Sequence, residues 1–386
     1  MHPEYMGGIK RVISILINEW EKACNIIVLS LAPYGTIYQI FGQAKQYIFP
    51  NTNSINSNEN LNLIKEIVHK HRIDIILQPF TNNTELTQLC INTKEETKIK
   101  LICAIHFSIN WKNEFMESYF FNKYRLRQKK IEWVKEVLLY FKYLLITKRK
   151  ISKDTLSYYN HLIKQSDKVV LLTKSHYQKL KELFNNNEIN NITYINNPAV
   201  LYDIPNNLYK RKKIIWCGRV EYSIKRVDRI IDIWKDIAPK YPDWELVVVG
   251  GGYIESSINL CKELNIPNIK FTGSCNPIEY YKKASIVCMT SSTEGLPMVL
   301  IEAMQYGCVP IAYKSYSSLQ EIIIDKENGF AITPFDKKQY IEKLELLMKD
   351  KELRHCMAQK GYESIKRFDH REIARRWIEL FHDVLQ

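Results

Sequence analysis

The sequence is low in glycine and proline, and it has neither paired cysteine motifs nor a long apolar run. Its 13 glycines and 13 prolines in 386 residues exclude a collagen-like or linker-rich chain. The nine cysteines are an odd number, scattered from Cys24 to Cys356 without a Cys-x-x-Cys pair. This pattern argues against a disulfide framework or a zinc site and favours reduced thiols in a cytosol. No apolar run reaches about 18 residues and no signal-peptide core opens the chain, so neither export nor a membrane span is predicted.

What remains is the composition of a folded chain with two domains. Hydrophobic residues make up 46% and charged residues 25% of the sequence, which excludes a disordered or fibrous protein. Single cores stop growing near roughly 250–300 residues, so a chain of this length predicts two of them.

The net charge of +13 is unevenly distributed. Residues 1–200 hold 27 Lys and Arg against 17 Asp and Glu, whereas residues 201–386 hold 28 against 25. A basic first half suggests an anionic partner, which could be a nucleic acid, a phosphorylated substrate or a membrane surface. The Lys- and Asn-rich composition of an AT-rich genome is an equally good explanation.

Short β-branched runs alternate with segments of helical period along most of the chain, which is typical of βαβ units and parallel sheets. In the first half the predicted strands are 26–31, 73–78, 99–105, 168–173 and 192–196, with a helical insertion at about 112–165. In the second half they are 213–217, 245–250, 269–272, 285–289 and 309–312, with three helices after Asp336. We therefore expect an α/β protein with two doubly wound domains that face each other across a cleft.

The segment from 285 to 312 is the most informative. A buried strand runs into the polar turn Thr290–Gly295, a helix starts at Pro297, and Gly307 follows its end. Proline at a helix start and glycine just past a helix end are typical boundary residues. The free N–H groups of Met298 and Val299, with the positive end of the helix dipole behind them, predict an anion site.

Two carboxylates flank this anion site. Glu294 stands in the loop at the carboxyl end of the strand, where open α/β sheets bind ligands. Glu302 lies one helical turn beyond Met298 on the same side of the helix. Carboxylates accept hydrogen bonds from vicinal hydroxyls, so a sugar and a ribose on either side of a diphosphate would fit. Gly295 allows a group to approach the backbone closely.

A second pair of residues supplies positive charge. Arg219 follows the strand 213–217 and Gly218, and Lys225 comes six residues later. An arginine and a lysine delivered by a strand end suit a diphosphate, although two solvated surface cations would look the same in the sequence.

At these residues the chain resembles the retaining glycosyltransferase family 4, also described as glycosyl transferases group 1. The resemblance covers residues 7–386 and is tightest from Ile214 to Phe330. It implies the GT-B fold, with two Rossmann-like domains: an acceptor-side domain at 1–205, a nucleotide-sugar donor domain at 206–368, and a helix at 369–386 that crosses back to the first domain. In the family, the residue at Glu302 binds the nucleotide ribose and the residue at Glu294 contacts the donor sugar.

The resemblance assigns further residues to the donor. Arg219 and Lys225 are implied at the diphosphate, although this chain has Arg226 where the family usually has glycine. His106, directly after a strand, is implied near the reacting end of the sugar. Together with Glu294, Arg219 and Lys225 it forms the expected catalytic set. The full donor-binding set comprises Gly7, Gly8, Gly218, Arg219, Lys225, Gly273, Glu294, Gly295, Leu296, Pro297, Met298, Val299 and Glu302.

Two features depart from the expected patterns. The family has a central strand before the loop at Gly7 and Gly8, and residues 1–6 are too short and polar to supply it. The triplet Gly250-Gly251-Gly252 is not a dinucleotide fingerprint, because Glu255 stands where the third glycine should be.

Residues 112–150 contain 11 Lys and Arg and 4 Glu, interleaved with ten aromatic residues counting Trp111. Such a segment suits an interfacial membrane contact, a nucleic-acid face, or a helical hairpin whose aromatic residues are core.

The sequence therefore predicts a retaining glycosyltransferase that moves a sugar from a nucleotide-diphosphate sugar to a hydroxyl acceptor in envelope, capsular or lipopolysaccharide synthesis. No metal and no cofactor besides the donor are expected. The expected partners are the donor, a glycan or lipid-linked acceptor and the surface of an anionic membrane, and the expected location is the cytoplasm or the inner face of its membrane. The alternatives are a nucleotide-sugar epimerase of the same fold, a degenerate nucleotide-sugar binder, and a nucleic-acid-binding protein that uses the basic half.

Overall fold

The computed structural model describes residues 8–31, 42–79, 83–109, 153–184, 189–202 and 210–386. Gly7, residues 1–6 and the basic aromatic segment at 112–150 lie outside these ranges, so the predictions for them stay predictions. The chain divides into two compact units. The first contains the described parts of 1–107, 153–200 and 368–386, and the second is built mainly from 201–367.

The first unit has two sets of parallel strands. A pair is formed by β1 (Ile27–Ser30) and β2 (Lys45–Ile48), and a four-stranded sheet has the order β3-β4-β5-β6. The members of this sheet are β3 (Ile75–Gln78), β4 (Lys100–Ile105), β5 (Lys168–Leu171) and β6 (Ile192–Tyr194). The sequence did not predict β2, because its four residues Lys-Gln-Tyr-Ile lack an apolar run.

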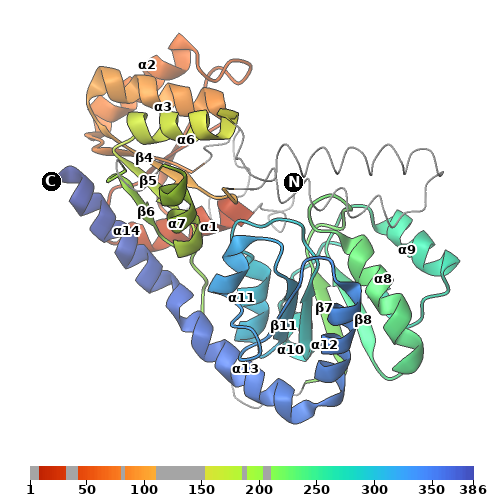
Figure 1. The fold of residues 1–386 in the computed structure, drawn as a ribbon. Helices are drawn as coiled ribbons and strands as arrows, with labels where there is room; N and C mark the ends of the chain where they lie inside the picture. Colours follow the sequence, from red (N-terminus) through yellow and green to blue (C-terminus); the bar gives the residue numbers. More distant parts are fainter. Residues whose placement is uncertain (1–7, 32–41, 80–82, 110–152, 185–188, 203–209) are drawn as a thin grey trace. The chain divides into compact units, whose positions relative to one another are not determined.

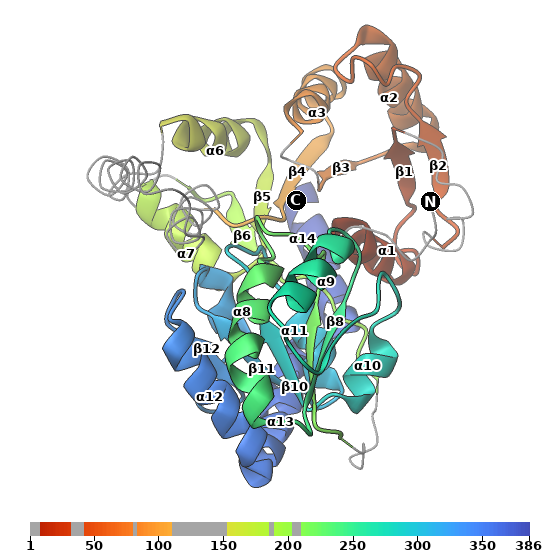
Figure 2. The ribbon, with the colours of Figure 1, turned by 90° about the vertical axis from the view of Figure 1, so that its right-hand side faces the viewer.

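Helices cover both faces of these strands (Figures 1 and 2). On one face α2 (Asn58–His71) and α3 (Thr84–Thr97) bury Ile64 and Leu89 against the strands. On the other, α1 (Gly8–Trp20) and α14 (His370–Leu385) form a second apolar cluster. Both β1 and β3 contribute residues to both clusters, yet they belong to separate sheets. Two more helices, α6 (Lys153–Gln165) and α7 (Lys174–Leu183), flank β5.

The second unit contains a six-stranded parallel sheet with the order β12-β11-β10-β7-β8-β9. Its strands are β7 (Lys213–Cys217), β8 (Glu245–Val249), β9 (Ile269–Phe271), β10 (Ile286–Met289), β11 (Val309–Tyr313) and β12 (Phe330–Ile332). The strand order reverses between β7 and β10, and ligands of open α/β sheets bind beside the carboxyl ends at such a switch point.

The helices of the second unit complete a doubly wound domain. They are α8 (Val227–Ile237), α9 (Ile254–Glu263), α10 (Ile278–Lys283), α11 (Met298–Gln305), α12 (Lys337–Lys349) and α13 (Lys351–Ile365). The main core lies between the sheet and α8 and α12, with Trp216, Trp234 and Tyr340 almost fully buried in it. Most strands match the predicted ranges within a few residues, and three helices follow Asp336 as predicted. The short strand β12 was not predicted.

Candidate donor site

Two loops meet at the carboxyl edge of the second sheet. One follows β7 and carries Gly218, Arg219 and Lys225, and the other follows β10 and carries Thr290 to Gly295. Because β7 and β10 are hydrogen-bonded neighbours, both loops emerge at the same point of the edge. The predicted cations and the first predicted carboxylate are therefore brought together.

Lys225 and Glu294 form an ion pair across these loops. The Lys225 Nζ donates to both carboxylate oxygens of Glu294, at 2.7 Å from Oε1 and 2.9 Å from Oε2. The side chains are 28% and 11% exposed, so the pair is partly shielded from water. Both residues were predicted at this edge, but the ion pair between them was not.

Arg219 differs from Lys225. It is exposed and makes no hydrogen bond or ion pair with any residue that the structure describes. Its backbone is fixed on both sides, because the Gly218 N–H donates to Val249 O at 3.0 Å and the Val220 N–H donates to Gly251 O at 2.7 Å. The guanidinium is therefore held at the edge by its backbone while its charge stays available.

The close packing against the backbone around Arg219 explains the triplet Gly250-Gly251-Gly252. A Cβ at Gly250 would lie 1.8 Å from Gly218 O, and one at Gly252 would lie 2.4 Å from Val220 O. Both glycines also have positive φ angles, 142° and 128°. The triplet therefore allows the β8–α9 loop to pack against the backbone that carries Arg219. Gly273 joins the same assembly, because its carbonyl accepts from the Gly250 N–H at 3.0 Å.

The helix start beside these loops differs slightly from the prediction. Pro297 is the N-cap of α11, and Met298 is its first residue, one position later than expected. Leu296 and Pro297 are buried, whereas Met298 and Val299 are half-buried. The first N–H groups of a helix have no partner inside it, so this end of α11 retains the geometry of an anion site.

Glu302 is half-buried on α11, and its charge acts on Cys217 at the end of β7. Burial raises the pKa of the Cys217 thiol to about 12, the neighbouring Tyr281 hydroxyl lowers it, the charge of Glu302 raises it further and that of Lys225 lowers it. Both predicted ligand-binding residues therefore lie within electrostatic range of one thiol. Neither Cys217 nor Tyr281 was singled out from the sequence, where each reads as an ordinary buried residue beside a strand or in a helix.

Arg226 stands where the resembling family usually has glycine, and its backbone has the left-handed conformation that glycine favours, with φ 54°. Its guanidinium donates to Asp228 Oδ1 at 2.9 Å and Oδ2 at 2.8 Å, and the side chain is only 3% exposed. The arginine therefore offsets the strain of its backbone with charged hydrogen bonds, and Lys225 keeps its position at the edge.

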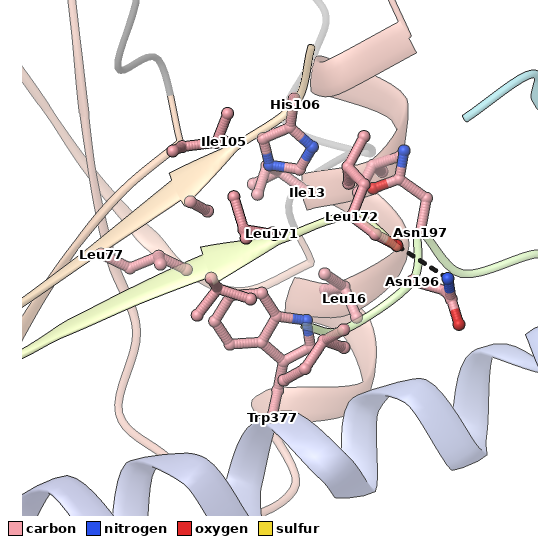
Figure 3. Close-up of a pocket in the computed structure, with 14 residues that line it drawn as sticks. Ile13, Leu16, Leu77, Ile105, His106, Leu171, Leu172, Asn196, Asn197 and Trp377 are labelled. Carbon is pink, nitrogen blue, oxygen red and sulfur yellow. Dashed lines mark hydrogen bonds between the residues drawn. The ribbon is translucent and has the colours of Figure 1, made fainter. Parts of the chain in front are cut away.

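His106 belongs to the other unit. It follows β4 beside a cavity of about 10 Å³, enough for one water molecule, between the strand ends, α1 and Trp377 (Figure 3). Neither ring nitrogen makes a hydrogen bond of normal geometry with a described residue. Burial lowers the pKa of His106 to about 4, and the neighbouring Asn197 amide offsets part of that effect. The ring is therefore neutral at pH 7. Gly8, the other described residue predicted in this unit, is the first residue of α1.

Neither a metal-binding cluster nor a membrane-spanning helix is found among the described residues. Among the described residues, no group of three or more His, Cys, Asp and Glu side chains could hold a metal ion. None of the helices in the described ranges is long and apolar enough to span a membrane.

Comparison with known proteins places this site in a family context. Residues 203–364 match the family described as Glycosyl transferases group 1. An uncharacterized glycosyltransferase of Haemophilus influenzae is 34% identical over 217 residues, which cover 55% of this chain and 60% of that protein. The amylovoran biosynthesis glycosyltransferase of Erwinia amylovora is 28% identical over 178 residues, covering 45% and 49%. The chain thus spans only about half to three fifths of these relatives.

A solved structure extends the likeness to nearly the whole chain. The Anabaena protein HepE, crystallised with UDP-glucose, superposes with a TM-score of 0.72 at 14% identity, covering 99% of this chain and 98% of that one. The fold is therefore GT-B, an α/β architecture with two Rossmann-like domains, and the predicted fold class is confirmed.

Proposed function

Because residues 203–364 match the family described as Glycosyl transferases group 1, we propose that this chain is a retaining glycosyltransferase. It moves a sugar from a nucleotide-diphosphate sugar to a hydroxyl of an acceptor glycan, in the synthesis of an envelope, capsular or lipopolysaccharide polymer. The role of the Erwinia relative, amylovoran biosynthesis, supports a polysaccharide product. UDP conjugates come first for testing, because HepE was crystallised with UDP-glucose.

The observation that carries the proposal is the convergence at the switch point of the second sheet. The exposed Arg219, the paired Lys225 and Glu294, and the start of α11 come from loops at the carboxyl ends of β7 and β10. Two cations and a helix N-terminus suit a diphosphate, and carboxylates on either side suit hydroxyl groups. In this proposal Glu302 binds the ribose and Glu294 binds the donor sugar.

Catalysis in this proposal is positioning together with charge stabilisation. Arg219, Lys225 and the first N–H groups of α11 take up the charge that develops on the departing diphosphate. The leaving phosphate accepts the proton of the acceptor hydroxyl on the same face of the sugar, so the anomeric configuration is kept. His106, neutral at pH 7, contacts the donor sugar near its reacting carbon. The reaction uses no divalent metal, and EDTA should leave the rate unchanged.

The first test is thermal melting with UDP, GDP, ADP, CMP and their sugar conjugates, on the wild type and on Glu302→Ala. A ligand present at about 100 times its Kd adds about 2.7 kcal/mol of stability, which raises the melting temperature by a few degrees. Stabilisation by one base should be lost in Glu302→Ala and kept in Glu327→Ala, a control at an exposed turn position. A well-folded protein that no nucleotide stabilises would contradict the proposal.

The second test is turnover with the donor that the melting panel selects. The anomeric configuration of the product, read by NMR, should match that of the donor. An inverted product, or a trapped covalent adduct between sugar and enzyme, would overturn the same-face route. Nucleotide binding without any transfer, across a panel of glycan acceptors, would point instead to a degenerate binder.

A further inference from the structure

The Lys225–Glu294 pair occupies the place where the proposed function needs a free cation. Both carboxylate oxygens of Glu294 accept from the Lys225 ammonium, at 2.7 and 2.9 Å. This two-oxygen contact resembles what a phosphate group would offer to the same lysine. Without a ligand, the positive charge of Lys225 is therefore already neutralised.

The backbones on either side of the pair are joined to each other. The Ser292 N–H donates to Ile224 O at 2.7 Å, and the Ser292 hydroxyl donates to Ser223 O at 3.2 Å. Thr290 Oγ1 donates to Arg226 O at 2.9 Å. These bonds connect the loop after β7 to the loop after β10 on both sides of Lys225. The pair can therefore open by rotation of two side chains while the loops stay in place.

We propose that Glu294 is an internal counter-ion that the donor diphosphate replaces on Lys225, and that the freed carboxylate then accepts hydroxyl groups of the donor sugar. This inference rests on the proposed function and deepens it. It makes Glu294 the residue by which the site distinguishes a nucleotide sugar from the bare nucleotide diphosphate that the reaction leaves behind.

The nucleotide sugar and the nucleotide diphosphate differ in the hydrogen-bond donors that they offer to Glu294 once its ion pair with Lys225 is broken. The carboxylate is only 11% exposed, so leaving it without a partner is unfavourable. A nucleotide sugar breaks the ion pair but supplies hydroxyl donors in exchange. A nucleotide diphosphate breaks the same pair and supplies none. The pair therefore opposes binding of the product more than binding of the substrate, and its return after transfer favours product release.

Arg219 offers an incoming anion a cation that Glu294 does not neutralise. It is exposed and has no ionic partner among the residues of the described structure, whereas the charge of Lys225 is neutralised by Glu294. A diphosphate can thus meet Arg219 first and reach Lys225 in a second step. The order predicts that the sugar alone, without a diphosphate, does not bind.

The test compares wild type with Glu294→Gln, which keeps the shape of the side chain and removes its charge. Affinities for UDP, for the matching sugar conjugate and for inorganic pyrophosphate are measured by calorimetry. In Glu294→Gln, UDP and pyrophosphate should bind at least about fivefold more tightly, because no ion pair has to break. The preference for the sugar conjugate over UDP should fall, and product inhibition should increase.

Two further variants show whether Lys225 carries the effect. In the Lys225→Met background, adding Glu294→Gln should no longer tighten UDP or pyrophosphate. Asp236→Asn is the matched control, because it removes one partner of the Lys337–Asp236 pair, with atoms 2.7 Å apart, elsewhere in the same unit. It should leave the affinities unchanged.

Unchanged or weaker UDP binding in Glu294→Gln would overturn the exchange while leaving the proposed function intact. Tighter pyrophosphate binding in a protein that binds no nucleotide sugar would support the exchange and contradict the proposed function. If neither pyrophosphate nor any nucleotide binds to either protein, both are overturned.

Discussion

Trp20, the last residue of α1, meets Trp377 of α14 edge to face, with ring centroids 5.8 Å apart and ring planes inclined by 70°. Phe381 closes the group with a centroid 5.3 Å from that of Trp20. The backbone of Ala199 also pairs with the entry to α14, since the Ala199 N–H donates to Phe368 O at 2.7 Å and the His370 N–H donates to Ala199 O at 3.0 Å. The last helix of the chain is therefore part of the core of the first unit.

Replacing Trp377 by alanine should destabilise the first unit by about 3–5 kcal/mol, because a nearly fully buried indole leaves a large cavity. The measurement is urea unfolding followed by hydrogen exchange of peptides from α1, so that the first unit is read separately. Leu385→Ala is the control, because Leu385 is on the same helix but 47% exposed. Its effect should stay within about 0.5 kcal/mol. Equal losses in the two variants would contradict the assignment of α14 to this core.

The sequence was sufficient for elements whose apolar pattern is continuous. Strands such as β8 and β10 are buried on both faces and read as unbroken apolar runs, so their positions could be predicted. The strand β2 was missed because its residues Lys-Gln-Tyr-Ile form no apolar run and none of them is buried, and β12 because three residues carry too little pattern. In each case it is pairing with a neighbouring strand that defines the element.

At the candidate site, residue types and spacing predicted which side chains reach the carboxyl edge, but not what they contact there. The Lys225–Glu294 pair joins residues 69 positions apart, and it depends on two loops meeting in space. The left-handed backbone at Arg226 is likewise invisible in a sequence, where an arginine after a lysine suggests only positive charge. The glycine triplet was recognised, but its role in supporting the Arg219 backbone required the distances.

Gly250→Ala should weaken both stability and nucleotide binding. Its Cβ would lie 1.8 Å from Gly218 O, so the backbone before Arg219 has to move. The free energy of unfolding should fall by about 1–3 kcal/mol, as for other overpacked positions. Chemical denaturation and calorimetry with UDP provide the two measurements. Gly361→Ala is the control within α13, because the nearest atom to its Cβ would be the flexible end of Met304, at 3.3 Å. If Gly250→Ala binds UDP as the wild type does, the supporting role of the triplet is wrong.

Acid should destabilise the first unit through His176. This side chain is 1% exposed, neither ring nitrogen has a partner among the described residues, and burial lowers its pKa from 6.5 to about 4. Between these two values the unfolded chain binds a proton that the folded chain does not, so stability falls as the pH drops from about 6.5 towards 4. The expected loss is on the order of 3 kcal/mol, all of it regained above pH 6.5.

The check is the urea midpoint between pH 7.5 and pH 4.5 for the wild type and His176→Gln. The variant should be less stable at pH 7.5, because its amide stays polar in an apolar site, but its midpoint should depend less on pH. The slope of the urea midpoint against pH reports the titration of His176, whereas the difference between the two proteins at pH 7.5 reports the change in packing. A slope as steep in His176→Gln as in the wild type would mean that other groups cause the acid sensitivity.

The reactivity of the Cys217 thiol tests whether Glu302 and Lys225 both lie close enough to change its pKa. Its thiol pKa is raised to about 12, chiefly by burial, with Glu302 raising it and Lys225 lowering it. Removing the negative charge in Glu302→Gln should lower this pKa, increase the thiolate fraction and speed alkylation of Cys217 by iodoacetamide at pH 9. Removing the positive charge in Lys225→Met should raise the pKa and slow the same reaction.

The rates are measured by mass spectrometry of the peptide that contains Cys217, with the exposed Cys356 as an internal reference for reagent and pH. Glu302→Gln keeps the shape of the side chain and Lys225→Met changes it little, so a purely steric effect would not change the two rates in opposite directions. Opposite changes therefore require the two charges themselves. If both variants react faster, the carboxylate and the ammonium do not converge on this thiol, and the arrangement of donor-binding residues at the β7 edge is wrong.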